Sequence, residues 1–200
     1  DGALAGAEAA AELGDGSLAA LLRSIALSHA VALDAGGVAE AGPGERTMPG
    51  AGDALVPDAG TALTTATIAD LAVEHDRAAF AYEVAAARSG AADGAAWLER
   101  ARQHRERAAT LVAIAGVEDR RADLYDVPVE QVETRAARRA SALERELALA
   151  DRYAALIDGA APQDVAWILS AAYDGYLDAA SLPTFAAGDV PALPGLDVRR

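Results

Sequence analysis

The chain has 200 residues, no cysteine and a formal net charge of −14, from 31 acidic residues against 17 basic ones that are all arginine. This length suits one domain, and the missing cysteines exclude disulfides, thiolate nucleophiles and thiolate-ligated metals. The negative charge argues against nucleic acid or an anionic membrane surface as a partner. Hydrophobic residues reach 52%, mostly alanine, whereas aromatic residues reach 4%. This composition favours helices in close contact, so we expect an all-α protein.

The N-terminal region, residues 1–35, is expected to form an additional helix packed on a bundle. Its longest helix is predicted over residues 17–35, from apolar residues and one histidine at helical spacing: Leu18, Leu21, Leu22, Ile25, His29, Ala32 and Leu33. A short alanine-rich helix is predicted over 3–12. No apolar run approaches the ~20 residues of a membrane span, so no transmembrane segment is expected. Residues 36–61 are rich in glycine and proline and predict a flexible linker.

Residues 62–182 carry the periodicity of a helical bundle. Its helices are expected over 62–89, 95–115, 129–158 and from 162 onward. Short turns make the first two helices and the last two helices antiparallel pairs. The longer connection, residues 116–128, has the reach for an overhand crossover, which predicts a ferritin-like four-helix bundle; a simple up-and-down bundle is the alternative. Residues 183–200 predict an irregular C-terminal tail.

Several short motifs resemble the actinobacterial ferritin-like family catalogued as domain of unknown function 4439. The similar segments are Leu71 to Tyr82, His104-Arg-Glu-Arg107, Tyr125-Asp-Val-Pro128, Leu143-Glu144 and Tyr153, within residues 62–180. Members of this family are often lipoproteins. The resemblance implies a ferritin-like fold and an extracytoplasmic protein, lipid-anchored through a removed N-terminal segment, and it brings no established activity.

A di-iron site in such a bundle needs one glutamate from each of two helices and a Glu-x-x-His motif from each of the other two. In the helix over 95–115, Glu99 lies five residues before His104, and the helix that begins at 162 has neither histidine nor glutamate. The sequence therefore predicts that the standard di-iron site is absent and that no cofactor is bound.

All three histidines, His29, His75 and His104, fall on the predicted apolar stripes of different helices. Counted from the turn near residue 91, His75 and His104 lie at similar levels, so they can be neighbours. Glu74 and Glu144 flank two of these stripes. One interpretation is a buried polar network that fixes helix register, with Glu74, Glu144 or Tyr82 as hydrogen-bond partners.

The other interpretation is a metal site made by His75, His104, Glu74 and Glu144, with zinc, iron or manganese as the ion. The network is the preferred interpretation, because the spacing matches no ligand motif. Four nearby arginines, Arg100, Arg102, Arg105 and Arg107, predict a solvated face paired with acidic residues such as Glu99 and Glu106.

Function follows from these two interpretations. The first predicts a non-enzymatic, exported binding or interaction module, with a protein partner or a second copy held through helical faces. The second predicts a metal-dependent oxidase or metal-storage protein that uses His75, His104 and Glu144.

Overall fold

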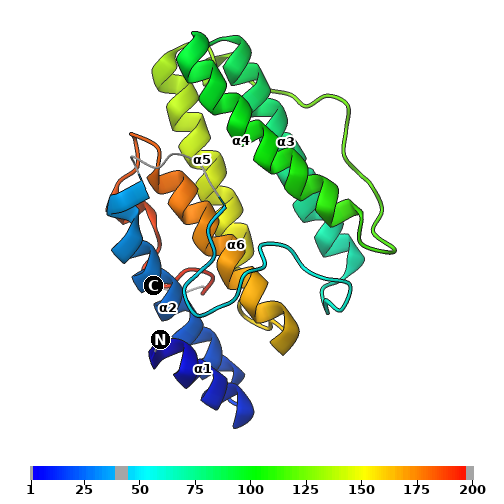
Figure 1. The fold of residues 1–200 in the computed structure, drawn as a ribbon, viewed down its shortest axis with the longest axis vertical. Coiled ribbons are helices and arrows are strands. Elements are labelled where there is room, and N and C mark those ends of the chain that lie inside the picture. The colour runs from blue at the N-terminus through cyan, green and yellow to red at the C-terminus, as the bar shows by residue number, and fades with distance from the viewer. Residues whose placement is uncertain (1, 39–44, 197–200) are drawn as a thin grey trace.

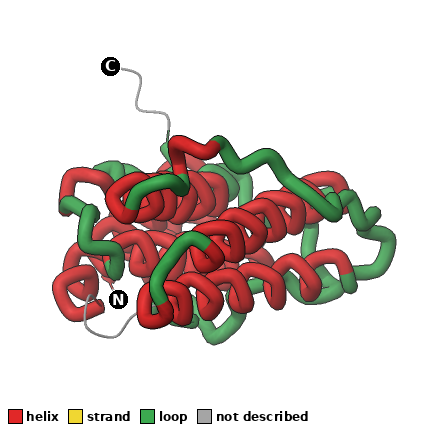
Figure 2. Tube along the Cα trace, turned by 90° about the horizontal axis from the view of Figure 1, so that it is seen from above, coloured by secondary structure: helices red, strands yellow, loops and turns green. Residues whose placement is uncertain are grey.

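The computed structural model describes residues 2–38 and 45–196, and the secondary structure of these residues is entirely helical (Figure 2). The helices are α1 (Gly2–Glu12), α2 (Gly16–Val38), α3 (Thr65–Ala87), α4 (Ala91–Val112), α5 (Arg135–Ala154) and α6 (Pro162–Ala180), with short 3-10 helices η1 (Val129–Gln131) and η2 (Ala187–Asp189). The all-α helical bundle predicted from the sequence is confirmed.

The four helices α3 to α6 form the bundle, and α1 with α2 packs beside α6 (Figure 1). Short turns make α3 with α4, and α5 with α6, antiparallel pairs. The long connection after α4 returns the chain to the end at which α4 began, so α5 runs parallel to α4 (Figure 1). An ion pair of 2.8 Å between Arg135 and Asp93 joins the first turns of these two helices. The connection is therefore a crossover, and the up-and-down alternative is wrong.

Local signals explain where the bundle helices begin. Thr64 and Thr134 each accept a hydrogen bond from a backbone N–H three residues later, at 3.1 and 3.0 Å. Such a cap satisfies one of the free N–H groups of a first turn. Thr134 also explains why the helix predicted over 129–158 is divided into η1 and α5. Pro162 occupies the first turn of α6, where its missing N–H has no cost.

Residues 45–64 contain no helix and lie along α6 as a strap. Residues 45–61 belong to the predicted flexible linker, whereas 62–64 were expected in the first bundle helix. Met48 is buried, and its N–H donates to Ser170 Oγ at 3.2 Å. The Ser170 hydroxyl also contacts the carbonyl of Gly52 at 3.2 Å, and the N–H of Ala62 donates to Asp164 Oδ2 at 2.9 Å. The strap thus covers the outer face of α6. The part of the linker at 39–44 lies outside the described residues.

The face of α2 that is buried differs from the predicted one. The buried residues are Ala19, Ala20, Ser24, Leu27 and Val31, whereas His29 is exposed and Leu33 keeps 82% of its accessible surface. The predicted stripe was wrong because α2 packs mainly on α1 and α6, which leaves an apolar face with Leu33 exposed. Within the described chain, one helix, over Gly16–Gly37, is long and apolar enough by length and composition to cross a membrane, although no apolar run of that length was expected.

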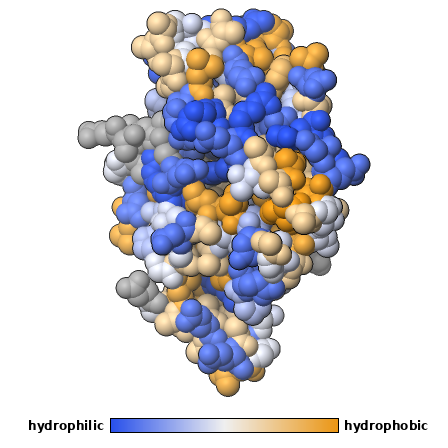
Figure 3. All heavy atoms as spheres, turned by 45° about the vertical axis from the view of Figure 1, so that its right-hand side comes forward, coloured by the Kyte–Doolittle hydropathy of each residue, from blue (hydrophilic) through white to orange (hydrophobic). Residues whose placement is uncertain are grey.

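The C-terminal tail is irregular after α6 except for η2. Pro194 is buried, and a Cβ atom at Gly195 would lie 1.9 Å from the carbonyl oxygen of Ala154. The tail therefore packs closely against the end of α5. On the face drawn in Figure 3, hydrophilic residues gather in a band across the upper half, at the height of α3, α4 and α5.

Candidate functional site

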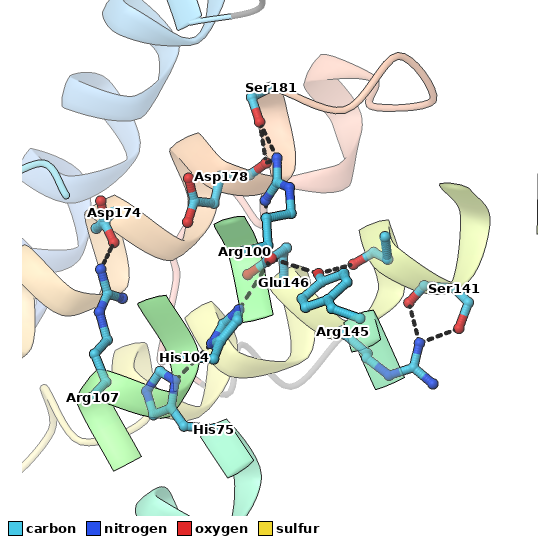
Figure 4. A network of polar contacts seen from close by, with 12 residues as sticks. His75, Arg100, His104, Arg107, Ser141, Arg145, Glu146, Asp174, Asp178 and Ser181 are labelled. Carbon is cyan, nitrogen blue, oxygen red and sulfur yellow. Dashed lines mark hydrogen bonds and ion pairs between the residues drawn. The ribbon is translucent and has the colours of Figure 1, made fainter. Parts of the chain in front are cut away.

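A chain of hydrogen-bonded side chains crosses the centre of the bundle (Figure 4). His75 of α3 and His104 of α4 face each other with their Nδ1 atoms 2.8 Å apart. The second ring nitrogen of His75 lies 2.6 Å from the hydroxyl of Tyr153, and that of His104 lies 3.3 Å from Glu146 Oε1. Both partners belong to α5, so the chain joins three helices.

The direction of each hydrogen bond in this series of side chains follows from the Glu146 carboxylate at one end. An ionised Glu146 can only accept, so His104 carries its proton on Nε2. The neutral His104 then accepts at Nδ1 from the Nδ1–H of His75, and His75 accepts at Nε2 from the Tyr153 hydroxyl. Every ring nitrogen is satisfied while both imidazoles are neutral.

Glu146 is the point at which further donors meet. Its Oε1 atom also accepts from the hydroxyl of Tyr82 at 2.6 Å and from Nη1 of Arg100 at 3.1 Å. Arg100 continues to α6, where Nη2 donates to the carbonyl of Asp178 at 3.3 Å and to the hydroxyl of Ser181 at 2.5 Å. One carboxylate therefore links all four bundle helices.

A second set of buried charges lies one to two turns further along α4. Arg107 forms an ion pair with Asp174 of α6, and the backbone N–H of Arg46 donates to the same carboxylate at 2.7 Å. The guanidinium of Arg46 lies 3.1 Å from Asp178. Buried charges are tolerated when they are paired in this way. Arg46 of the strap therefore helps to compensate the buried carboxylates of Asp174 and Asp178 on α6.

The pKa shifts follow from burial and from these partners. Burial, together with the positive charge of His104 in its protonated form and of Arg107, holds the pKa of His75 well below its ordinary value. Burial alone would raise the pKa of Glu146, but His104, Arg100 and Tyr82 outweigh it and keep that pKa low. Burial raises the pKa of Tyr153. The site therefore holds an ionised Glu146 carboxylate beside a neutral His75 imidazole and neutral phenols.

The four residues of the predicted metal site do not come together. His75 and His104 are 1% and 4% exposed. They are adjacent, as predicted from their similar distances to the turn near residue 91. Glu74 lies on the surface with Arg77 at 3.0 Å, and Glu144 is exposed. The assignment of Glu74 and Glu144 to the site was wrong, because the buried face of α5 is centred on Glu146, two residues further along.

The arrangement does not fit a metal ion. In the described part of the chain, no group of three or more histidine, aspartate or glutamate side chains is placed to hold one. Two nitrogens bound to one zinc ion at about 2.0 to 2.1 Å would lie roughly 3.3 Å apart, whereas those of His75 and His104 are at hydrogen-bond distance. The guanidinium of Arg100 occupies the position beside Glu146 where a cation would be needed.

Arg100 and Arg107 were expected on a solvated face and are 4% and 6% exposed. Arg102 does lie on the surface, where it pairs with Glu99 and Glu106 at 2.6 Å, as predicted. The signal that distinguishes them is present in the sequence: Arg100 and Arg107 lie three or four residues from His104, whereas Arg102 falls on the opposite side of the helix.

A cavity of about 440 Å³ lies away from this network, between α1, α2, the strap and the start of α6. Its walls are mainly apolar, and Glu8, Glu12 and Arg23 are its charged members. The complete lining is Leu4, Ala7, Glu8, Ala11, Glu12, Arg23, Gly50, Ala51, Pro162, Val165, Ala166 and Leu169. Burial lowers the pKa of Arg23, which the negative charge of Glu8 partly offsets.

Comparison with known proteins gave no matching family model, no matching curated protein and no matching solved structure. The function therefore has to be argued from the geometry of this chain.

Proposed function

We propose that this chain is a non-enzymatic binding module, of ferritin-like architecture, that takes a small and mainly apolar ligand between its N-terminal hairpin and α6. The observation that carries the proposal is the contrast between the two interior regions. At the polar centre His75 and Glu146 are each 1% exposed, and their ring nitrogens and carboxylate are occupied by hydrogen bonds to one another's neighbours. The cavity beside Arg23 is open and has the volume of a small-molecule site.

The charged residues that line the cavity indicate which polar group a ligand would carry. Among the described residues no hydrogen-bond partner of Arg23 is found, whereas Glu8 acts on it only through space. A ligand with an apolar body and one polar group could pair with Arg23 or with the carboxylates of Glu8 and Glu12. A concave, apolar site with few polar groups is the common form of such pockets.

A dye test addresses the cavity directly. Nile red, which is neutral and fluoresces in apolar surroundings, should bind with saturation. Ala11→Trp, on the cavity wall, should reduce the bound signal several-fold. Ala9→Trp is the matched control, because Ala9 is exposed on the same helix and does not line the cavity. Equal dye binding by the two variants would remove the proposal.

The metal-dependent alternative is tested separately. If the network is structural, the melting temperature should be the same with zinc, iron(II), manganese or a chelator. A shift of several degrees on addition of one metal, abolished by a chelator, would favour the oxidase or storage function instead.

We also propose that the protein is exported and that its helical faces hold a protein partner or a second copy. The family resemblance and the apolar helix α2 support export. A fusion of the full-length gene product to alkaline phosphatase, which is active only outside the cytoplasm, should show activity in an actinobacterial host. An inactive fusion that accumulates in the cytoplasm would contradict export.

A further inference from the structure

A groove of about 270 Å³ lies on the surface between α3 and α5, separate from both regions above. Its lining consists of Glu74, Arg77, Ala78, Arg145, Ala148, Leu149 and Arg152. Three guanidinium groups face a single carboxylate in this lining. In a chain with a net charge of −14, such a local excess of positive charge is unexpected.

The arginines of this groove are also poorly compensated. Arg102 and Arg105, on α4, each contact two carboxylates. Among the described residues Arg145 instead bonds to neutral acceptors alone, the Ser141 carbonyl at 3.1 Å, the Ser141 hydroxyl and the Gln131 amide oxygen at 2.7 Å (Figure 4). Burial lowers its pKa, and Glu144 and Glu146 act on it only through space.

Arg152 and Arg77 complete the set. Arg152 is exposed, and among the described residues no hydrogen bond or ion pair from it is found. It lies seven residues after Arg145, two turns along the same face of α5, or about 10 Å. Arg77 approaches from α3, where it pairs with Glu74 at 3.0 Å and lies over the ring of Tyr125. The groups therefore converge on the groove from two helices.

We infer that this groove binds a small phosphate monoester. The lining carries a charge of about +2, which a dianionic phosphate balances, and the guanidinium group is suited to bidentate contacts with phosphate oxygens. Ala78 and Leu149 are buried beneath the groove and Ala148 borders it, which gives an apolar surface for the organic part of the ligand. The overall negative charge does not prevent binding, because at physiological salt charges beyond about 8 Å are largely screened.

Isothermal titration calorimetry with phenyl phosphate tests this inference. The wild-type protein should bind it with a 1:1 stoichiometry, more tightly than benzoate, which has the same ring and one negative charge. Affinity should fall when sodium chloride is raised from 50 to 300 mM. Similar affinities for the two compounds, or no saturable heat at millimolar concentrations, would overturn the inference.

Variants locate the site. Arg152→Gln should weaken binding by roughly tenfold or more, as expected for loss of a charged hydrogen bond, and its side chain holds nothing else in place. Arg145→Gln should do the same, although its contacts with Gln131 and Ser141 make folding a separate check by circular dichroism. Arg102→Gln removes an equal charge on α4 and should leave affinity unchanged. Equal losses in Arg152→Gln and Arg102→Gln would exclude the groove.

Two further probes separate the sources of phosphate. Inorganic phosphate should bind more weakly than phenyl phosphate, since it lacks a ring for the apolar surface. Vesicles of phosphatidylcholine with phosphatidate should not retain the protein in a flotation assay. Retention by these vesicles without binding of phenyl phosphate would assign the groove to a lipid headgroup and overturn the small-ligand inference. Because Ala11→Trp leaves the groove intact, failure here is distinguishable from failure of the cavity proposal.

Discussion

At the scale of single residues, the polar centre depends on Glu146, because three donors converge on one of its oxygens. Its neighbour Glu144, two residues earlier on the same helix, is exposed. Removing one partner of a buried ion pair leaves the other charge uncompensated, whereas removing a surface charge has little effect.

Glu146→Gln should therefore lower the free energy of unfolding by roughly 3 to 5 kcal/mol, because the Arg100 guanidinium loses its countercharge. Glu144→Gln, the matched control, should change it by no more than about 0.5 kcal/mol. Urea unfolding followed by circular dichroism gives both values from the midpoint and slope. Equal effects of the two substitutions would mean that Glu146 does not carry the network.

His75 gives the centre a pH dependence whose sign can be worked out. Its pKa in the folded protein lies well below 6.5, so below pH 6.5 the unfolded chain binds more protons than the folded one. Its contribution to stability is present above pH 6.5 and is lost as the pH falls, by at most about 1.4 kcal/mol per pH unit.

This contribution must be measured as a difference, because Asp178 acts in the opposite sense. Burial and the nearby carboxylates of Asp174 and Glu146 raise its pKa to about 7, so its contribution is lost as the pH rises from about 4 through 7. The stability of the wild type minus that of His75→Gln should fall between pH 7 and pH 5. A flat difference over that range would contradict the shift in the pKa of His75.

The sequence predicted the two histidines as neighbours but not the residue that connects them. The similar heights of His75 and His104 along the bundle follow from the rise per residue of a helix and from the short turn between α3 and α4. Both features can be read from nearby sequence. Glu146 has Ala142, Leu149 and Tyr153 at helical spacing around it, which is a signal of a buried charge. Charged residues on helices are usually exposed, so this signal alone is weak. Burial of Glu146 also requires its partner Arg100 on the facing helix, a contact that the sequence does not reveal.

At the scale of elements, α5 and α6 approach each other closely at Gly175. A Cβ atom there would lie 3.0 Å from the Cβ and 3.2 Å from the Cα of Ala150. Because part of this contact is backbone, relief requires the helices to separate. Gly36 of α2 is also helical, but none of the described neighbouring residues has an atom within 4 Å of a Cβ built there.

The substitution of alanine at these two glycines should have opposite effects. Gly175→Ala should destabilise the protein by roughly 1 to 3 kcal/mol through overpacking. Gly36→Ala should stabilise it by up to about 1 kcal/mol, since alanine restricts the unfolded chain and favours the helix. Thermal unfolding by calorimetry measures both. A stabilising Gly175→Ala would show that α5 and α6 can separate at little cost.

The helices themselves were predictable because their signals are local. Pro162 and the short turns placed most boundaries within a few residues of those observed, whereas Thr64, which caps α3, lies inside the helix that was predicted from residue 62. The strap was not predictable as a packed segment, because its contacts join residues such as Met48 and Ser170 that are far apart in sequence. Its glycines and prolines exclude a helix but do not say what the segment lies against.

At the scale of the whole molecule, the two hairpins α3–α4 and α5–α6 meet through charged and hydrogen-bonded side chains as well as through apolar ones. His75, His104 and Arg100 reach from the first hairpin to residues of the second. Within each hairpin the two helices contact each other directly along their length (Figure 1), and polar pairs such as Arg105 with Glu83 and Tyr176 with Asp151 add to these contacts. The surface between the hairpins is therefore the part of the fold most sensitive to protonation.

We expect acid to loosen this surface before the helices melt. The pKa of Glu146 is lower in the folded protein than its ordinary value of 4.5, so its stabilising contribution is lost as the pH falls below that value. Protonation of Glu146 and of the imidazoles leaves Arg100 and Arg107 in a positively charged interior. The helices keep their backbone hydrogen bonds, and the result is a compact state with disturbed side-chain packing.

Circular dichroism between pH 7 and pH 2 measures the two levels of structure separately. The near-ultraviolet signal should decline at a higher pH than the far-ultraviolet signal, because Trp97 stacks on Tyr82, which bonds to Glu146, and Trp167 contacts Tyr153. In Glu146→Gln, which cannot titrate at this position, the near-ultraviolet signal should be reduced already at pH 7. Simultaneous loss of both signals in the wild type would mean that the hairpins do not separate before they unfold.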